Sequence, residues 1–155
     1  MTISIDVNPD QLTRLDLSPV RASIEREPRE LLSIEGALKF SIDYPRSEDD
    51  PRELSEIPEV RLWFVRLDSV YPWIPFLLDP KSGEIARYAA MLVPHRFHRT
   101  EGIQYNPEAL EIFVMQKVFV LADWLKKNGI SPRSRVKSFA QLFGYDLDEA
   151  FLDSL

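Results

Sequence analysis

The sequence contains no cysteine among its 155 residues. A chain without thiols cannot form disulfides, cannot offer a thiolate nucleophile, and cannot hold zinc or an iron–sulfur cluster through sulfur. Its five glycines are scattered, so it has no phosphate-binding glycine loop, no G-x-G-x-x-G and no G-x-S-x-G elbow. The residues therefore predict no catalytic group and no cofactor.

Long apolar runs and an excess of positive charge are also missing. No run approaches the ~20 residues that a membrane-spanning helix needs. A net charge of −6 and a pI near 5.0 disfavour binding to nucleic acid or to anionic lipid. The opening residues, MTISIDVNPD, lack the basic and apolar regions of a secretion signal and the Arg/Ser bias of a transit peptide.

Hydrophobic patterning predicts an α+β fold. A chain of this length is normally one domain, so we expect a single domain over residues 1–155. Ile3–Val7 and residues 37–44 alternate apolar and polar side chains, which favours strands. The last third is predicted to be helical, so the expected architecture is a small, mostly antiparallel sheet packed by C-terminal helices.

The helix boundaries of the last third are marked by capping residues. Asn106 and Pro107 predict a helix start, and Gly129 predicts its end after about Asn128. A second helix is expected from Ser131-Pro132 to Gly144. Asp146 is the expected cap of a short last helix.

Two segments are ambiguous. The β-branched and aromatic residues at 60–68 favour a buried strand, although the same residues also fit one face of a helix. Asp79 to Gly83 has proline early and glycine last, which favours a hairpin turn. The alternative at 84–92 is a helix that starts after Ser82.

Charge is concentrated in two places. The acidic segment, Asp43 to Glu59, has seven acids and two bases, a net charge of −5. The basic segment, Lys126 to Lys137, has five bases and no acid. These segments are either solvated faces that can pair with each other or charged contact surfaces for a partner.

Four further residues raise questions of chemistry. His95 and His98 are separated by two residues and follow Pro94. This is not the helical spacing of zinc motifs, so we expect a polar loop and no metal. Gln104 and Tyr105 precede the capped helix, and capping does not explain them.

Lys117 lies on the broad apolar side of the long predicted helix, between Phe113, Leu121 and Trp124. A buried lysine is costly unless it is paired or reaches water. We expect an internal ion pair with a carboxylate. The alternatives are a side chain that reaches solvent and a lysine that lines a functional cleft.

Three long stretches are distinctive: "DDPRELSEIPEVRLWFVRLDSVYPWIPFLLD", "ARYAAMLVPH" and "EGIQYNPEALEIFVM". Together they resemble the chlororespiratory reduction family of assembly factors, in particular its sixth member, over roughly Leu38 to Gly144. The resemblance implies a maturation factor for NdhI, the ferredoxin-like iron–sulfur subunit of the photosynthetic NAD(P)H dehydrogenase-like complex. Without a transit peptide the chain resembles a cyanobacterial form, which implies a cytoplasmic location. It implies no catalytic residue.

An assembly factor needs a contact surface and no reactive group. The chain would act by binding the cluster-bearing subunit. Because it lacks cysteine, it could not itself be a thiolate scaffold for the cluster. The alternatives are a permanent structural subunit of the same complex and a small enzyme with Lys117 and His95 in a pocket. From the matching stretches and unexplained polarity, the expected partner contacts are Asp49, Asp50, Arg52, Glu53, Arg87, Tyr88, Gln104 and Tyr105.

Overall fold

The computed structural model describes residues 2–155, and the predicted α+β class is confirmed. The chain divides into two compact units, Met1–Leu92 and Val93–Leu155. The single domain expected over 1–155 stays a prediction. Among residues 2–155, no helix combines the length and the apolar character needed to cross a membrane.

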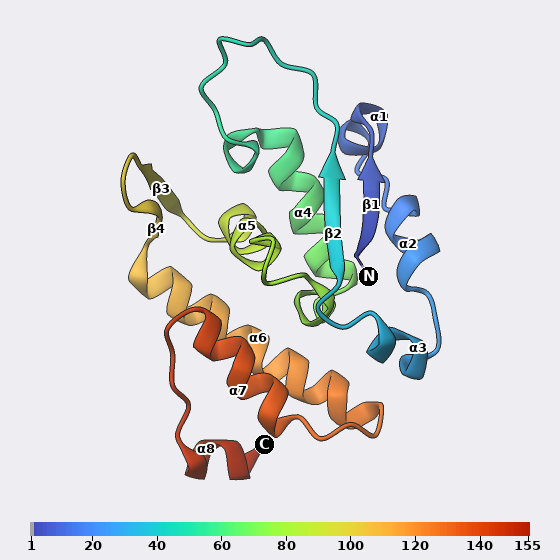
Figure 1. Ribbon diagram of the computed structural model, residues 1–155, viewed down its shortest axis with the longest axis vertical. Helices are drawn as coiled ribbons and strands as arrows, with labels where there is room; N and C mark the ends of the chain where they lie inside the picture. Colours follow the sequence, from blue (N-terminus) through green and yellow to red (C-terminus); the bar gives the residue numbers. More distant parts are fainter. Residues whose placement is uncertain (1) are drawn as a thin grey trace. The chain divides into compact units, whose positions relative to one another are not determined.

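The first unit contains a small parallel sheet with helices between and after its two strands (Figure 1). β1 pairs with β2 from Ile3 opposite Leu38 to Val7 opposite Ile42. The predicted alternation is confirmed, because Ile5, Val7, Leu38 and Phe40 are buried. The elements in chain order are β1 Ile3–Val7, α1 Pro9–Thr13, α2 Ser18–Ile24, α3 Pro28–Ser33, β2 Leu38–Ile42, η1 Leu54–Glu56, α4 Pro58–Val70, η2 Ile74–Leu77 and α5 Glu84–Leu92.

The sheet arrangement differs from the expected single, mostly antiparallel sheet. The described residues form two separate two-stranded sheets, and only the pair in the second unit is antiparallel. Three helices lie between β1 and β2. A connection of that length is the crossover that parallel pairing requires, whereas antiparallel neighbours can be joined by a short turn.

Residues 60–68 are helical, so the strand favoured there is wrong. α4 buries Val60, Trp63, Phe64 and Leu67, whose spacing is that of one helix face. A strand would direct Trp63 and Phe64 to opposite sides. On the helix they instead both pack edge to face against Phe40, with ring centroids 5.8 and 5.3 Å away.

Residues 79–83 do not form a hairpin. The Asp79 amide donates to the Leu38 carbonyl at 2.8 Å, so the chain after η2 runs beside β2. Gly83 then adopts a φ of 79°, in the region that favours glycine, immediately before α5. The alternative helix that starts after Ser82 is therefore the correct interpretation.

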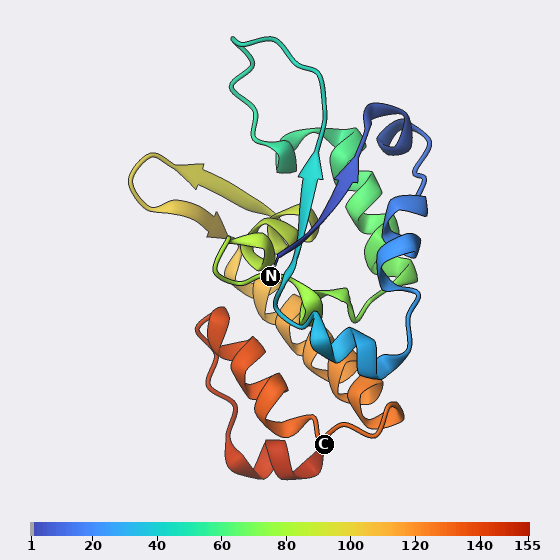
Figure 2. The ribbon, with the colours of Figure 1, turned by 45° about the vertical axis from the view of Figure 1, so that its right-hand side comes forward.

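The second unit begins with a two-stranded antiparallel ribbon that leads into the longest helix (Figure 2). The Asn106 carboxamide oxygen accepts from the Ala109 amide at 3.0 Å, as the capping pattern predicts. The last helix is capped by Asp148 and not by Asp146, because the Asp148 carboxylate accepts from the Phe151 amide. The elements are β3 His95–His98, β4 Gly102–Tyr105, α6 Pro107–Lys127, α7 Arg133–Leu142 and α8 Glu149–Ser154.

Candidate partner-binding surfaces

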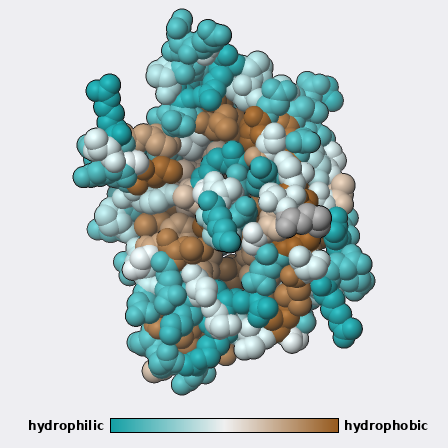
Figure 3. Space-filling model, viewed as in Figure 1, coloured by the Kyte–Doolittle hydropathy of each residue, from teal (hydrophilic) through white to brown (hydrophobic). Residues whose placement is uncertain are grey.

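The acidic segment begins as an irregular loop that extends beyond the end of β2 (Figures 1 and 2). In the same view as Figure 1, the residues at the top, where this loop lies, are mostly hydrophilic (Figure 3). Glu48, Asp49 and Glu53 are exposed, and Asp50 is half-buried. The loop therefore presents carboxylates to solvent in the first unit.

Hydrogen bonds within the loop give it a defined shape. Arg52 donates from Nη2 to Asp50 Oδ2 at 2.8 Å and from Nε to Asp50 Oδ1 at 3.0 Å. The Arg52 amide donates to the same carboxylate, and Arg46 Nη1 donates to the Arg52 carbonyl. Hydrogen bonding to Arg52 lowers the pKa of Asp50 to about 2. Asp50 and Arg52 therefore neutralise each other, which leaves Asp49 and Glu53 as the exposed charges beside them.

Both ends of the loop are attached to helices of the same unit. The Tyr44 hydroxyl donates to Glu59 on α4 at 3.2 Å. The Glu53 amide donates to the Glu56 carboxylate at 2.7 Å at the start of η1. Glu53 and Glu56 thus form a capping box at the start of η1, and Glu59 holds the Tyr44 side chain. Glu48 and Asp49 are the exposed carboxylates in the middle of the loop.

Arg87 occupies a structural position at the outer edge of β2. Its Nη2 donates to the Phe40 carbonyl at 2.6 Å and to Glu84 at 2.8 Å. The same Glu84 oxygen accepts from the Phe40 amide at 3.3 Å. One ion pair on α5 therefore satisfies both backbone groups of Phe40 and covers an edge that would otherwise be open.

Tyr88 is not available to a partner, which corrects its assignment as a contact residue. It is 1% exposed, and its hydroxyl donates to Asp68 on α4 at 2.6 Å. Burial and the nearby carboxylate raise the pKa of the Tyr88 phenol well above its ordinary value. Tyr88 connects α5 to α4 inside the first unit.

Gln104 and Tyr105 both lie on β4, which accounts for the polarity that helix capping left unexplained. Gln104 is exposed, and its side-chain amide donates to Glu101 at the turn. Tyr105 is half-buried, and burial raises the pKa of its phenol to about 12. A pocket of about 400 Å³ borders them, lined by Pro94, His95, Arg96, Gln104, Tyr105, Asn106 and Pro107.

The two histidines lie on β3 and not in the polar loop expected for them. His95 Nδ1 is 2.9 Å from the Val93 carbonyl, and its ring packs edge to face with Phe97. His98 Nδ1 accepts from the Thr100 and Glu101 amides, so this side chain holds the turn. Residues 2–155 contain no group of three or more potential metal ligands. The absence of a bound metal stays a prediction.

The basic segment is largely neutralised within the second unit. Arg133 on α7 pairs with Glu149 and Asp153 on α8, and Lys137 pairs with Glu149 at 3.3 Å. Lys127 pairs with Asp123 one turn earlier on α6. The acids of α8 were visible in the sequence, but only the fold shows that they lie beside α7. This surface is therefore not a free positive contact surface.

Lys117 lies in the middle of α6 and is 1% exposed. Its ammonium group is 5.8 Å from the centroid of the Phe113 ring, one turn earlier. The ion pair with a carboxylate stays a prediction.

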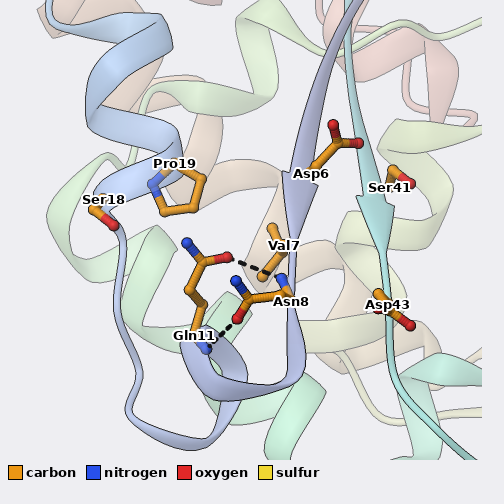
Figure 4. A pocket seen from close by; sticks show the side chains of 8 residues that line it. All are labelled: Asp6, Val7, Asn8, Gln11, Ser18, Pro19, Ser41 and Asp43. Carbon is orange, nitrogen blue, oxygen red and sulfur yellow. Dashed lines mark hydrogen bonds between the residues drawn. The ribbon is translucent and has the colours of Figure 1, made fainter.

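A second pocket, of about 460 Å³, lies in the first unit beside the end of β1 (Figure 4). Two of its polar side chains hold the backbone at the start of α1. Asn8 and Gln11 exchange two hydrogen bonds of 2.9 Å at the start of α1, and the Ser18 hydroxyl donates to Asp16. The lining residues are Asp6, Val7, Asn8, Gln11, Ser18, Pro19, Ser41 and Asp43. These side chains are those of helix starts and strand ends, and they include no histidine to serve as a base.

The acidic loop and the ribbon both present charged side chains to solvent. The family model described as chlororespiratory reduction 6 matches residues 7–154, nearly the whole chain. The chain belongs to this family, which extends the resemblance seen from Leu38 to Gly144 to almost the full length. Membership implies a part in the biogenesis of the NAD(P)H dehydrogenase-like complex. No solved structure matches the chain.

Proposed function

We propose that this protein is a non-catalytic, cytoplasmic assembly factor that binds NdhI, or an early intermediate that contains NdhI, and leaves before the complex is finished. Family membership is the observation that carries the proposal. The absence of cysteine adds to it, because a chain without thiolates can accompany a cluster-bearing subunit but cannot hold the cluster through sulfur.

The part of the acidic segment from Asp49 to Glu53 is the proposed contact surface. Asp49 and Glu53 are exposed on either side of the Asp50–Arg52 pair, which fixes the loop before a partner arrives. A loop that is already ordered loses less conformational entropy on binding. Carboxylates at the rim of an interface speed association with a positively charged surface. We assign Asp50 and Arg52 the role of shaping the loop, and Asp49 and Glu53 the role of attracting the partner.

Charge reversal with a matched control tests this surface. Asp49→Lys with Glu53→Lys should slow association with purified NdhI, and the difference from the parent should shrink as salt rises. The control reverses two exposed acids of the second unit, Glu111 and Asp146, and changes the net charge by the same amount. Equal association rates for the two double variants would refute the acidic segment as the contact surface. If both double variants associate more slowly than the parent and to the same extent, the cause is net charge and not the acidic segment.

A further inference from the structure

The outer edge of β1 carries backbone groups that no other part of residues 2–155 uses. Successive residues of a strand direct their amide and carbonyl alternately to its two sides. The Ile3 amide donates to a carbonyl just before β2 at 2.8 Å, and the Val7 carbonyl accepts from an amide just after β2 at 2.9 Å. The amides and carbonyls of Ser4 and Asp6 therefore point away from β2. Both residues are exposed, and within residues 2–155 these groups have no hydrogen-bond partner.

The outer edge of β2 is closed, so the two edges of this sheet differ. The Leu38 carbonyl accepts from the Asp79 amide at 2.8 Å. Both backbone groups of Phe40 are bonded as well, the amide to Glu84 and the carbonyl to Arg87. Proteins usually cover or blunt the edges of their sheets, because unpaired strand groups can bind a further strand. Here the chain covers one edge and leaves the other free.

One face of the sheet is also uncovered. Ser4 and Asp6 on β1 lie opposite Lys39 and Ser41 on β2, and all four are exposed. Parallel sheets are usually covered on both faces. The side chains of a strand added beside β1 would therefore find solvent, and not another layer of the protein, on this face.

A pocket adjoins the end of the free edge (Figure 4). It is the pocket of about 460 Å³, and Asp6 belongs both to its lining and to the free edge. Ser18 and Pro19, at the start of α2, line it on the side of β1 that faces away from β2, so the helix leaves space beside the end of the strand. Its charged lining residues, Asp6 and Asp43, are both acidic. The pocket therefore favours a basic side chain.

We propose that the outer edge of β1 binds a short extended segment of a partner protein as an added strand, and that a lysine or arginine of this segment pairs with Asp6. Backbone hydrogen bonds to Ser4 and Asp6 supply affinity, and the side chain beside Asp6 supplies specificity. The site goes beyond the proposed function, because it does not require that the partner is NdhI. A second copy of this chain is a poorer occupant, because it would bring its own Asp6 and a net charge of −6 to an acidic edge.

Nuclear magnetic resonance on the full chain tests the site with defined peptides. The probe is a short peptide in which lysine alternates with valine. One control peptide replaces lysine with glutamate, and the other has every backbone amide methylated, which removes its donors. We expect the probe to shift the Ser4 and Asp6 amide signals and to slow their hydrogen exchange, and both controls to bind more weakly. Unchanged exchange at Ser4 and Asp6 near saturating probe, or equal binding of either control peptide, would overturn the proposal.

Two pairs of variants separate the backbone contribution from the charge. Ser4→Pro removes an outward amide without touching the β1–β2 hydrogen bonds, so it should weaken probe binding by about fivefold or more, whereas Ser4→Ala should bind like the parent. Asp6→Asn should weaken binding by about two- to fivefold. Asp146→Asn, on an exposed residue of the second unit, makes the same change in net charge and should have no effect. Equal binding within either pair would overturn the assignment.

Folding and self-association have their own readouts. A parent-like amide spectrum outside residues 2–7 shows that a variant is folded. If Ser4→Pro disturbs the sheet, the methylated peptide on the parent protein still decides whether backbone hydrogen bonds carry the binding. Slow exchange at Ser4 and Asp6 in the peptide-free protein, growing with protein concentration, would overturn the proposal, since a second copy would then occupy the edge.

Discussion

Replacing Glu84 with alanine should destabilise the first unit, because this one carboxylate satisfies two groups at the edge of β2. Glu84 is 7% exposed. Its Oε2 accepts from the Phe40 amide at 3.3 Å and from Arg87 Nη2 at 2.8 Å. The substitution leaves a buried backbone amide without an acceptor and removes the counterion of a partly buried guanidinium.

The magnitude follows from these two losses. An unsatisfied buried amide costs about 1–3 kcal/mol. Breaking a fully buried ion pair costs about 3–5 kcal/mol, but the Arg87 side chain is 28% exposed, so solvent screens it and its share is smaller. We expect a total loss of about 2–4 kcal/mol in the free energy of unfolding. For a chain of this length that corresponds to a fall in Tm of roughly 5–15 °C.

Urea and thermal unfolding measure the effect. Glu84→Gln keeps an acceptor for the amide and should therefore cost less than Glu84→Ala. Glu111→Ala, on an exposed position of α6, is the control and should stay within about 0.5 kcal/mol of the parent. An alanine variant that unfolds within that same margin would refute the structural role given to Glu84 and Arg87.

Three other predictions concern charged groups. Lys117→Ala should lower the free energy of unfolding by about 3 kcal/mol or more, because truncation leaves the partner of a buried cation without its counterion. Lys117→Met should lower it less, and an unchanged urea midpoint for Lys117→Ala would contradict this prediction. Asp50 has a pKa lowered to about 2, so its pair with Arg52 is complete above the ordinary value of 3.8 and is lost as pH falls towards 2. A titration of the Asp50 carboxyl should have its midpoint near 2, and Arg52→Met should raise this midpoint. A midpoint of 3.8 in the parent protein would contradict the pairing. Purified protein should contain no stoichiometric metal, and zinc or iron that disappears when His95 and His98 become alanine would show the reverse.

Local signals predicted the helices of the second unit, but not its β3–β4 ribbon. Asn106, Pro107 and Gly129 predicted the bounds of α6 to within a residue, because capping depends on groups within one turn. The strands β1 and β2 followed from alternation for the same reason. Asp146 was a less successful choice than Asp148, since two acids of equal capping ability lie two residues apart.

The features that sequence patterns did not predict depend on contacts between residues far apart in the chain. Trp63 and Phe64 favour strands by residue type, yet both are buried against Phe40 because α4 supplies one continuous apolar face. Glu84 hydrogen-bonds a strand 44 residues earlier in the chain, a contact that no local pattern contains. Tyr88 was an expected partner contact because it lies in a matching stretch, whereas α5 directs its side chain into the core of the first unit.

Quantitative co-purification from a photosynthetic cell extract tests the central claim most directly. The protein, tagged and kept at low salt, should recover NdhI well above the background of an untagged extract, while the mature complex should contain it at far below one copy per NdhI. Failure to recover NdhI at low salt, or equal stoichiometry with NdhI in the mature complex, would contradict a transient assembly factor.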